Sequence, residues 1–120
     1  MQCLQLTRGE PPATTVDVVL SGDFQDSYGY VTIDGTQYTS AQTLTVAKGT
    51  SVTVHCGSTF PMPTAQNKLI ITLNGTTVAQ GGKGSPAEYT FAVTANCSIV
   101  LTKKLASGFP YYTADITMPA

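Results

Sequence analysis

Hydrophobic and polar residues alternate along most of the chain. In residues 15–20 the apolar side chains of Val16, Val18 and Leu20 share one face, and residues 51–56 repeat the pattern. A period of two is typical of half-buried β-strands, because successive side chains point to opposite sides of a sheet. The segments with this pattern are 15–20, 30–33, 36–39, 43–46, 51–56, 69–73, 76–79, 89–93, 98–102 and 112–116. No segment has a convincing helical period, so the pattern predicts an all-β fold.

Turn signals separate these segments. Asp34-Gly35 and Asn74-Gly75 each stand between two strand segments, and such dipeptides supply the positive φ angles of a tight hairpin. The stretch 57–64 holds two prolines, which cannot donate to a ladder, and is expected to be a loop. The glycine-rich stretch 80–86 is expected to be an exposed, mobile connection.

The sequence also repeats itself. Residues 31–36 (VTIDGT) return as 71–76 (ITLNGT), and residues 44–54 return, after a longer loop, as 91–101. Two similar strand sets packed face to face would form a sandwich with one core. The expected fold is therefore an immunoglobulin-like β-sandwich of about seven to nine antiparallel strands. Its domain would span residues 15–120, after an N-terminal arm or edge strand at residues 1–14.

Composition and charge reduce the number of function classes that fit the chain. The net charge is -1 and 11% of residues are charged, which gives no long-range field to attract nucleic acid or an anionic membrane. The longest apolar runs, such as 69–71, are far too short for membrane insertion. The first nine residues lack the basic and apolar pattern of a secretory signal, so synthesis in the cytoplasm without a signal peptide is expected.

The three cysteines are Cys3, Cys56 and Cys97. An odd number without a CxxC pair favours thiols kept reduced. Cys56 and Cys97 are both expected to face inward, where they would act as small apolar residues. A disulfide between them is the alternative.

The chain offers few candidates for catalysis or metal binding. His55 is the single histidine, and a nucleophile pair with Cys56 is disfavoured because neighbours on a strand point to opposite faces. We expect His55 to be an exposed residue at a strand end. Asp23 and Asp26 are candidate Ca²⁺ ligands, although turn-forming aspartates with local backbone bonds are favoured. The remaining carboxylates are scattered, so no enzyme activity, cofactor or metal is expected.

Aromatic residues form two groups. Tyr28, Tyr30 and Tyr38 surround the first hairpin, and Phe109, Tyr111 and Tyr112 lie near the end of the sequence. Exposed tyrosines suit contact with protein or sugar, so Tyr28, Tyr30, Tyr38, Phe109 and Tyr111 are candidate partner contacts. The alternative is that tyrosines such as Tyr30 and Tyr112 only cover the sheet faces.

Residues 1–12 are a further candidate for partner contact. Met1, Cys3, Leu4 and Leu6 form a short apolar tract, which a stiff Pro11-Pro12 spacer follows. We expect an attachment arm that adds a strand to a neighbouring subunit, with Leu4 and Leu6 in pockets on one face. A frayed terminus or an edge strand of the same domain is the alternative.

Three runs, residues 30–46, 89–99 and 111–117, carry a family resemblance. They resemble small immunoglobulin-like proteins and modules encoded among the structural genes of tailed bacteriophages and prophages of gut bacteria. The resemblance implies a non-enzymatic protein at the virion surface, most simply a capsid decoration or accessory protein that binds the major capsid protein or another virion protein. A receptor- or carbohydrate-binding module of a phage tail or bacterial surface, which contacts a host-surface protein or glycan, is the alternative. A homo-oligomer is compatible with both.

Overall fold

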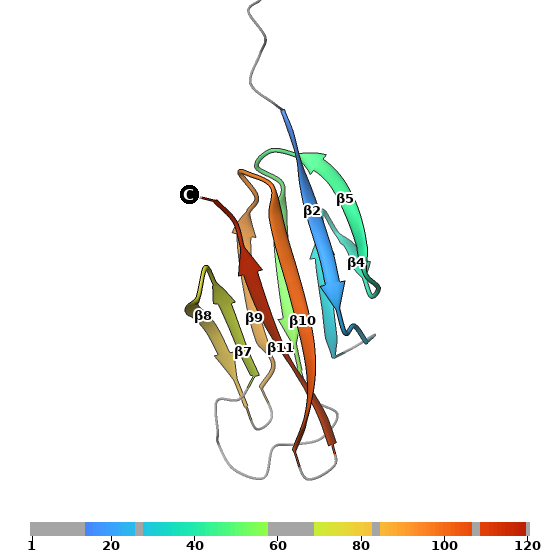
Figure 1. The fold of residues 1–120 in the computed structure, drawn as a ribbon, viewed down its shortest axis with the longest axis vertical. Helices are drawn as coiled ribbons and strands as arrows, with labels where there is room; N and C mark the ends of the chain where they lie inside the picture. The colour runs from blue at the N-terminus through green and yellow to red at the C-terminus, as the bar shows by residue number, and fades with distance from the viewer. Residues whose placement is uncertain (1–13, 26–27, 58–68, 83–84, 107–108, 120) are drawn as a thin grey trace, which may run out of the picture.

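The computed structural model describes residues 14–25, 28–57, 69–82, 85–106 and 109–119. Every regular element in this part of the chain is a β-strand (Figure 1). The strands are β2 (Thr15–Gly22), β3 (Gly29–Ile33), β4 (Thr36–Tyr38), β5 (Gln42–Ala47), β6 (Ser51–Cys56), β7 (Leu69–Leu73), β8 (Thr76–Gly81), β9 (Ala87–Ala92), β10 (Cys97–Ala106) and β11 (Phe109–Thr117). The all-β prediction is confirmed, but seven to nine strands is too low a number for the ten described.

The strands form two sheets. The six-stranded sheet has the order β5-β2-β10-β11-β7-β8, and the four-stranded sheet has the order β4-β3-β6-β9. In Figure 1 the six-stranded sheet faces the viewer, with β8 and β5 at its two edges. β2 pairs with β10 in parallel, and β7 pairs with β11 in parallel. The expectation of antiparallel strands is therefore wrong for these two pairs, whose members are far apart in the sequence and have no hairpin to set their direction.

The sequence repeat is visible in the sheet order. In the first copy of the repeat, the β3-β4 hairpin and β6 belong to the four-stranded sheet, and β5 belongs to the six-stranded sheet. In the second copy, the β7-β8 hairpin and β10 belong to the six-stranded sheet, and β9 belongs to the four-stranded sheet. If β2 and β11 are left out, the six-stranded sheet has the order β8-β7-β10-β5, which corresponds strand by strand to the order β4-β3-β6-β9 of the other sheet. β2 and β11 enlarge one of the two equivalent sheets.

Glycine-containing turns close both repeated hairpins. Asp34 and Gly35 have φ angles of 50° and 83°, and Asn74 and Gly75 have φ angles of 51° and 85°. Two consecutive residues with positive φ match the right-handed twist of the strands that they connect. The two predicted turns are confirmed.

The core lies between the sheets and follows the predicted alternation. Val52, Val54 and Cys56 of β6 are completely buried, and they face Ile99 and other inward side chains of the six-stranded sheet. The buried apolar residues are Val16, Val18, Leu20, Val31, Ile33, Val52, Val54, Cys56, Leu69, Ile71, Ala87, Val93, Cys97, Ile99, Leu101, Tyr112, Ala114 and Ile116. Burial of such side chains is the main source of stability in a sandwich of this size.

The connection between β8 and β9 is tighter than predicted. Residues 80 and 81 belong to β8, and Gly81 is buried rather than exposed. Gly82 and Ser85 exchange two backbone hydrogen bonds of 2.9 and 3.0 Å. A Cβ atom on Gly81 would lie 2.5 Å from the Ser85 carbonyl oxygen, so the glycine permits this close return of the chain.

Cys56 and Cys97 are free, buried thiols, and this prediction is confirmed. The Tyr112 amide donates to the carbonyl of Gly57, the residue after Cys56, and Tyr112 pairs with Lys103 of β10. Lys103 is six residues from Cys97, which corresponds to about 20 Å along a strand. The two thiols therefore lie towards opposite ends of the sandwich, beyond the reach of a disulfide.

Two expectations fall on other parts of the sequence. The N-terminal arm and most of the proline-containing stretch 57–64 lie outside the described residues. Within the part of the chain that the structure does describe, there is no helix with the length and apolarity that a membrane span requires.

Candidate functional site

The outer face of the four-stranded sheet carries two rows of polar and aromatic side chains. Alternation along β3 and β6 sends Val31, Val52 and Val54 into the core, so the residues between them point outward. The strand register then aligns these outward residues across the sheet. Because the backbone fixes their spacing, the rows form a preorganised surface.

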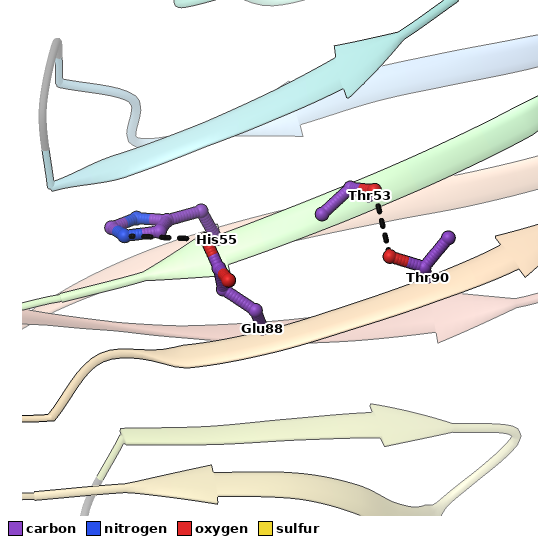
Figure 2. A network of polar contacts seen from close by, with 4 residues as sticks. All are labelled: Thr53, His55, Glu88 and Thr90. Atoms are coloured by element: carbon purple, nitrogen blue, oxygen red, sulfur yellow. Dashed lines mark hydrogen bonds and ion pairs between the residues drawn. The ribbon is translucent and has the colours of Figure 1, made fainter.

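The first row consists of Tyr30, His55 and Glu88 on three neighbouring strands. Tyr30 is the direct partner of His55, and His55 is the direct partner of Glu88. The rings of Tyr30 and His55 are stacked, with centroids 4.4 Å apart and an angle of 10° between their planes. Nε2 of His55 lies 3.9 Å from a carboxylate oxygen of Glu88 (Figure 2). The row thus presents an aromatic stack with a carboxylate at one end.

The second row is rich in hydroxyl groups. Gln37, Thr32, Thr53 and Thr90 are successive partners across β4, β3, β6 and β9. The hydroxyl oxygens of Thr53 and Thr90 are 2.8 Å apart and share a hydrogen bond, and Figure 2 shows the two side chains pointing toward each other. Cross-strand threonine pairs of this kind stabilise a sheet and leave hydroxyl groups at its surface.

The burial of His55 corrects one expectation. His55 was expected to be exposed, yet only 8% of its surface is accessible. The Tyr30 ring covers one side, and Gly57 approaches so closely that a Cβ atom there would lie 3.3 Å from the imidazole. Nδ1 is buried and has no hydrogen-bond partner among the described residues. The predicted separation from Cys56 is confirmed, because Cys56 lies on the inner face of the same strand.

The predicted contact tyrosines do not form one patch. Tyr30 lies on the outer face of the four-stranded sheet, but Tyr38 is paired with the inward-facing Val31. Tyr28, Tyr38 and Tyr111 are partly buried and pack against the core. Tyr112 is buried, and its hydroxyl donates a 2.6 Å hydrogen bond to Gln25. These four tyrosines, Tyr28, Tyr38, Tyr111 and Tyr112, therefore belong to the core or pack against it.

Other predicted contacts lie beyond the described residues. These are Leu4, Leu6 and the side chain of Phe109, whose backbone belongs to β11. Asp26, one of the two candidate Ca²⁺ ligands, also falls there.

Three of the four described aspartates, Asp17, Asp23 and Asp115, bind groups within the sheets. Asp17 accepts a hydrogen bond from the Thr45 hydroxyl at 2.9 Å. Asp115 accepts one from the Thr72 hydroxyl at 2.7 Å. Asp23 accepts the Lys103 backbone N–H at 3.0 Å, 80 residues away in the sequence. The expectation of a local turn bond is therefore wrong for Asp23, because its carboxylate ties the end of β2 to β10. In the described part of the chain, no three histidine, cysteine or acidic side chains are grouped closely enough to hold a metal ion.

Sequence reasoning missed Glu88, Thr53 and Thr90 as parts of one surface. The period of two marks each of them as outward-facing. Their alignment depends on the pairing of β6 with β9. Two other strands, β7 and β8, lie between these in the chain, and the pattern within each strand carries no information about its partner.

Comparison of the chain with protein-family models, with curated proteins and with solved structures finds no match to any of them.

Proposed function

We propose that the protein is a non-enzymatic, virion-associated structural protein. In this proposal it is a capsid decoration or accessory protein that binds the shell and presents an immunoglobulin-like surface. Two independent features support the proposal. One is the resemblance of residues 30–46, 89–99 and 111–117 to phage proteins of this class, and the other is the two-sheet, all-β fold.

The observation that carries the proposal is that the described aspartates Asp17, Asp23 and Asp115 and the thiol of Cys56 take part in the structure of the sandwich. The carboxylates of Asp17, Asp23 and Asp115 each accept a hydrogen bond from a group on a neighbouring strand. The thiol of Cys56 is completely buried, and burial raises its pKa to about 12, which keeps it protonated. A thiol that stays protonated is a poor nucleophile, so Cys56 serves as a core residue and the three carboxylates serve as cross-strand acceptors.

The proposal is tested on particles of the phage or prophage that encodes the chain. Particles are purified on a density gradient, and the protein is quantified beside the major capsid protein. We expect co-sedimentation at a fixed ratio, including in tail-less particles. Absence from the purified particles would contradict a virion role, and presence only in fractions that contain tails would contradict binding to the capsid.

The Tyr30–His55 stack favours a second function, recognition of a host glycan. The partly exposed Tyr30 ring, which His55 supports from one side, and the threonine hydroxyls of the second row offer the apolar face and the hydrogen-bonding groups that sugar rings use. Glycan-array binding by the protein should be lost in Tyr30→Ala and retained in Thr102→Ala, which alters an outward position of the six-stranded sheet. Absence of binding to any glycan, or equal binding by both variants, would refute this alternative.

A further inference from the structure

β5 has one unpaired edge among the described strands. It is the last strand of the six-stranded sheet and pairs only with β2, with Thr15 opposite Ala47 and Val16 opposite Val46. The Lys48 amide donates to the Thr14 carbonyl at 2.8 Å, just beyond the last pair. Antiparallel strands alternate between hydrogen-bonded and non-hydrogen-bonded pairs.

This bond therefore fixes the direction of the β5 backbone groups. Every second residue from Lys48 bonds to β2, which leaves the N–H and C=O groups of Thr43 and Thr45 and the N–H of Ala47 directed away from the sheet. The Ala47 carbonyl already accepts the Thr50 N–H. Together the outward groups form a row that can receive another strand.

β5 lacks the features that protect the other edges. β4 has three residues, β8 contains a register shift opposite Ile71 and Thr72, and β9 carries a charge at Glu88. Short strands, irregular pairing and charges are recognised protections against edge pairing. The β5 sequence, QTLTVA, has six residues and contains no proline, glycine or charge.

The inner side chains of β5 are also incompletely covered. Leu44 and Val46 are partly exposed, whereas their partners Val18 and Val16 on β2 are buried. A strand added beside β5 would cover Leu44 and Val46 with its own side chains, which lie at every second position.

The segment of this chain that fits the edge is residues 1–12. Residues 2–7, QCLQLT, equal β5 in length, and Leu4 and Leu6 have the same two-residue spacing as Leu44 and Val46. Six extended residues span about 20 Å, which is the length of β5. We propose that residues 2–7 of one chain add a strand to β5 of a second copy, with Leu4 and Leu6 beside Leu44 and Val46.

A second copy fits better than the same chain. Residues 1–13 join the sheet at Thr14, on the β2 side of β5, so the same chain would have to cross the Ala47 end and reverse direction. Proline restricts its own φ angle and disfavours a helical conformation in the residue before it, so the sequence Pro11-Pro12 disfavours this reversal. Reciprocal exchange between two copies would fill both edges and close a symmetric dimer. This inference is independent of the proposed virion role.

The test is the oligomeric state of the full chain, measured by sedimentation equilibrium over a range of concentrations. Thr43→Pro removes one outward N–H and leaves the ladder to β2 intact, and Thr43→Ser is its matched control. On the arm, Leu4→Asp with Leu6→Asp is matched by Gln5→Asp with Thr7→Asp. Thermal melts of all four variants establish that the sandwich is folded.

We expect a dimer that Thr43→Pro weakens roughly thirtyfold, since each of two contacts loses a main-chain bond. The Leu4/Leu6 variant should be monomeric, and both controls should dimerise as the parent does. Mixing Thr43→Pro with the Leu4/Leu6 variant should produce a heterodimer, because one intact arm and one intact edge remain. A monomeric parent, or a dimer that neither variant weakens, would overturn the proposal. If Thr43→Pro fails to fold, the arm variants alone decide the result.

Discussion

Replacement of Gly22 by alanine should destabilise the protein more than replacement of any hairpin glycine. Gly22 ends β2 with a φ of 97°, a conformation that side chains disfavour. A Cβ atom there would lie 2.0 Å from the backbone oxygen of Leu101, which already accepts the Asp23 N–H at 2.8 Å. The added methyl group therefore collides with main chain that joins β2 to β10.

Gly75 supplies the reference for the magnitude. Its φ is 85°, but a Cβ atom would meet no atom within 4 Å, so Gly75→Ala carries only the backbone strain. That strain is about 1–2 kcal/mol. In Gly22→Ala the Leu101 carbonyl must also move and lose its bond from Asp23, which adds about 1–3 kcal/mol. The expected losses are thus about 1–2 kcal/mol for Gly75→Ala and about 2–5 kcal/mol for Gly22→Ala.

Urea denaturation measures the difference. With a slope of about 1–3 kcal/mol per molar urea, the Gly22→Ala midpoint should fall below the Gly75→Ala midpoint by several tenths of a molar unit or more. Equal midpoints, or a larger loss for Gly75→Ala, would show that β2 and β10 do not approach each other at Gly22 as described.

Three other changes test the core. Val54→Ala should lower the free energy of unfolding by about 2–4 kcal/mol, because Val54 is completely buried. Its control, Ala92→Ser, alters an exposed residue and should change the free energy of unfolding by less than about 0.5 kcal/mol. Equal urea midpoints for the two variants would show that the strand register is wrong. Tyr112→Phe removes the 2.6 Å bond to Gln25 and should lower the free energy of unfolding by about 1 kcal/mol, and an unchanged thermal melt would contradict the importance of this bond. Burial raises the pKa of the Cys56 thiol from its ordinary 9.0 to about 12, so the unfolded chain releases this proton first as the pH rises. Stability should therefore fall between pH 9 and pH 12, and by less in Cys56→Ala; parallel pH profiles would argue against a buried thiol.

Local patterns predicted the strands and the repeated turns. The period of two identified strand segments because burial of one face imposes it, and Asp34-Gly35 and Asn74-Gly75 specify turns because few residues accept positive φ. The strand ends were less accurate. β10 and β11 continue beyond the predicted segments, where pairing between their ends extends the ladder through residues that lack a clear alternation.

The assignment of strands to sheets could not be predicted in the same way. β5 and β9 each leave the sheet of their sequence neighbours, and β2 and β11 are inserted by parallel pairing with distant strands. These choices depend on contacts between remote segments, which no local pattern encodes.

The candidate site shows the same limit. The sequence singled out Tyr30, but it gave no reason to place His55 against the Tyr30 ring, since that contact depends on the pairing of β3 with β6. The prediction that His55 is exposed was wrong for this reason. The sequence also gave no sign that Tyr38, a predicted partner contact, packs against the core, because this position follows from its pairing with Val31.

The central proposal is that this sandwich belongs to a virion and binds its shell. If this proposal is correct, a phage or prophage encodes the chain, and cryo-electron microscopy of its intact particles tests the proposal most directly. We predict density at repeated positions on the capsid surface into which the six-stranded and four-stranded sheets fit, and which is missing from particles made without the protein. Identical capsid density with and without the protein would contradict the proposal.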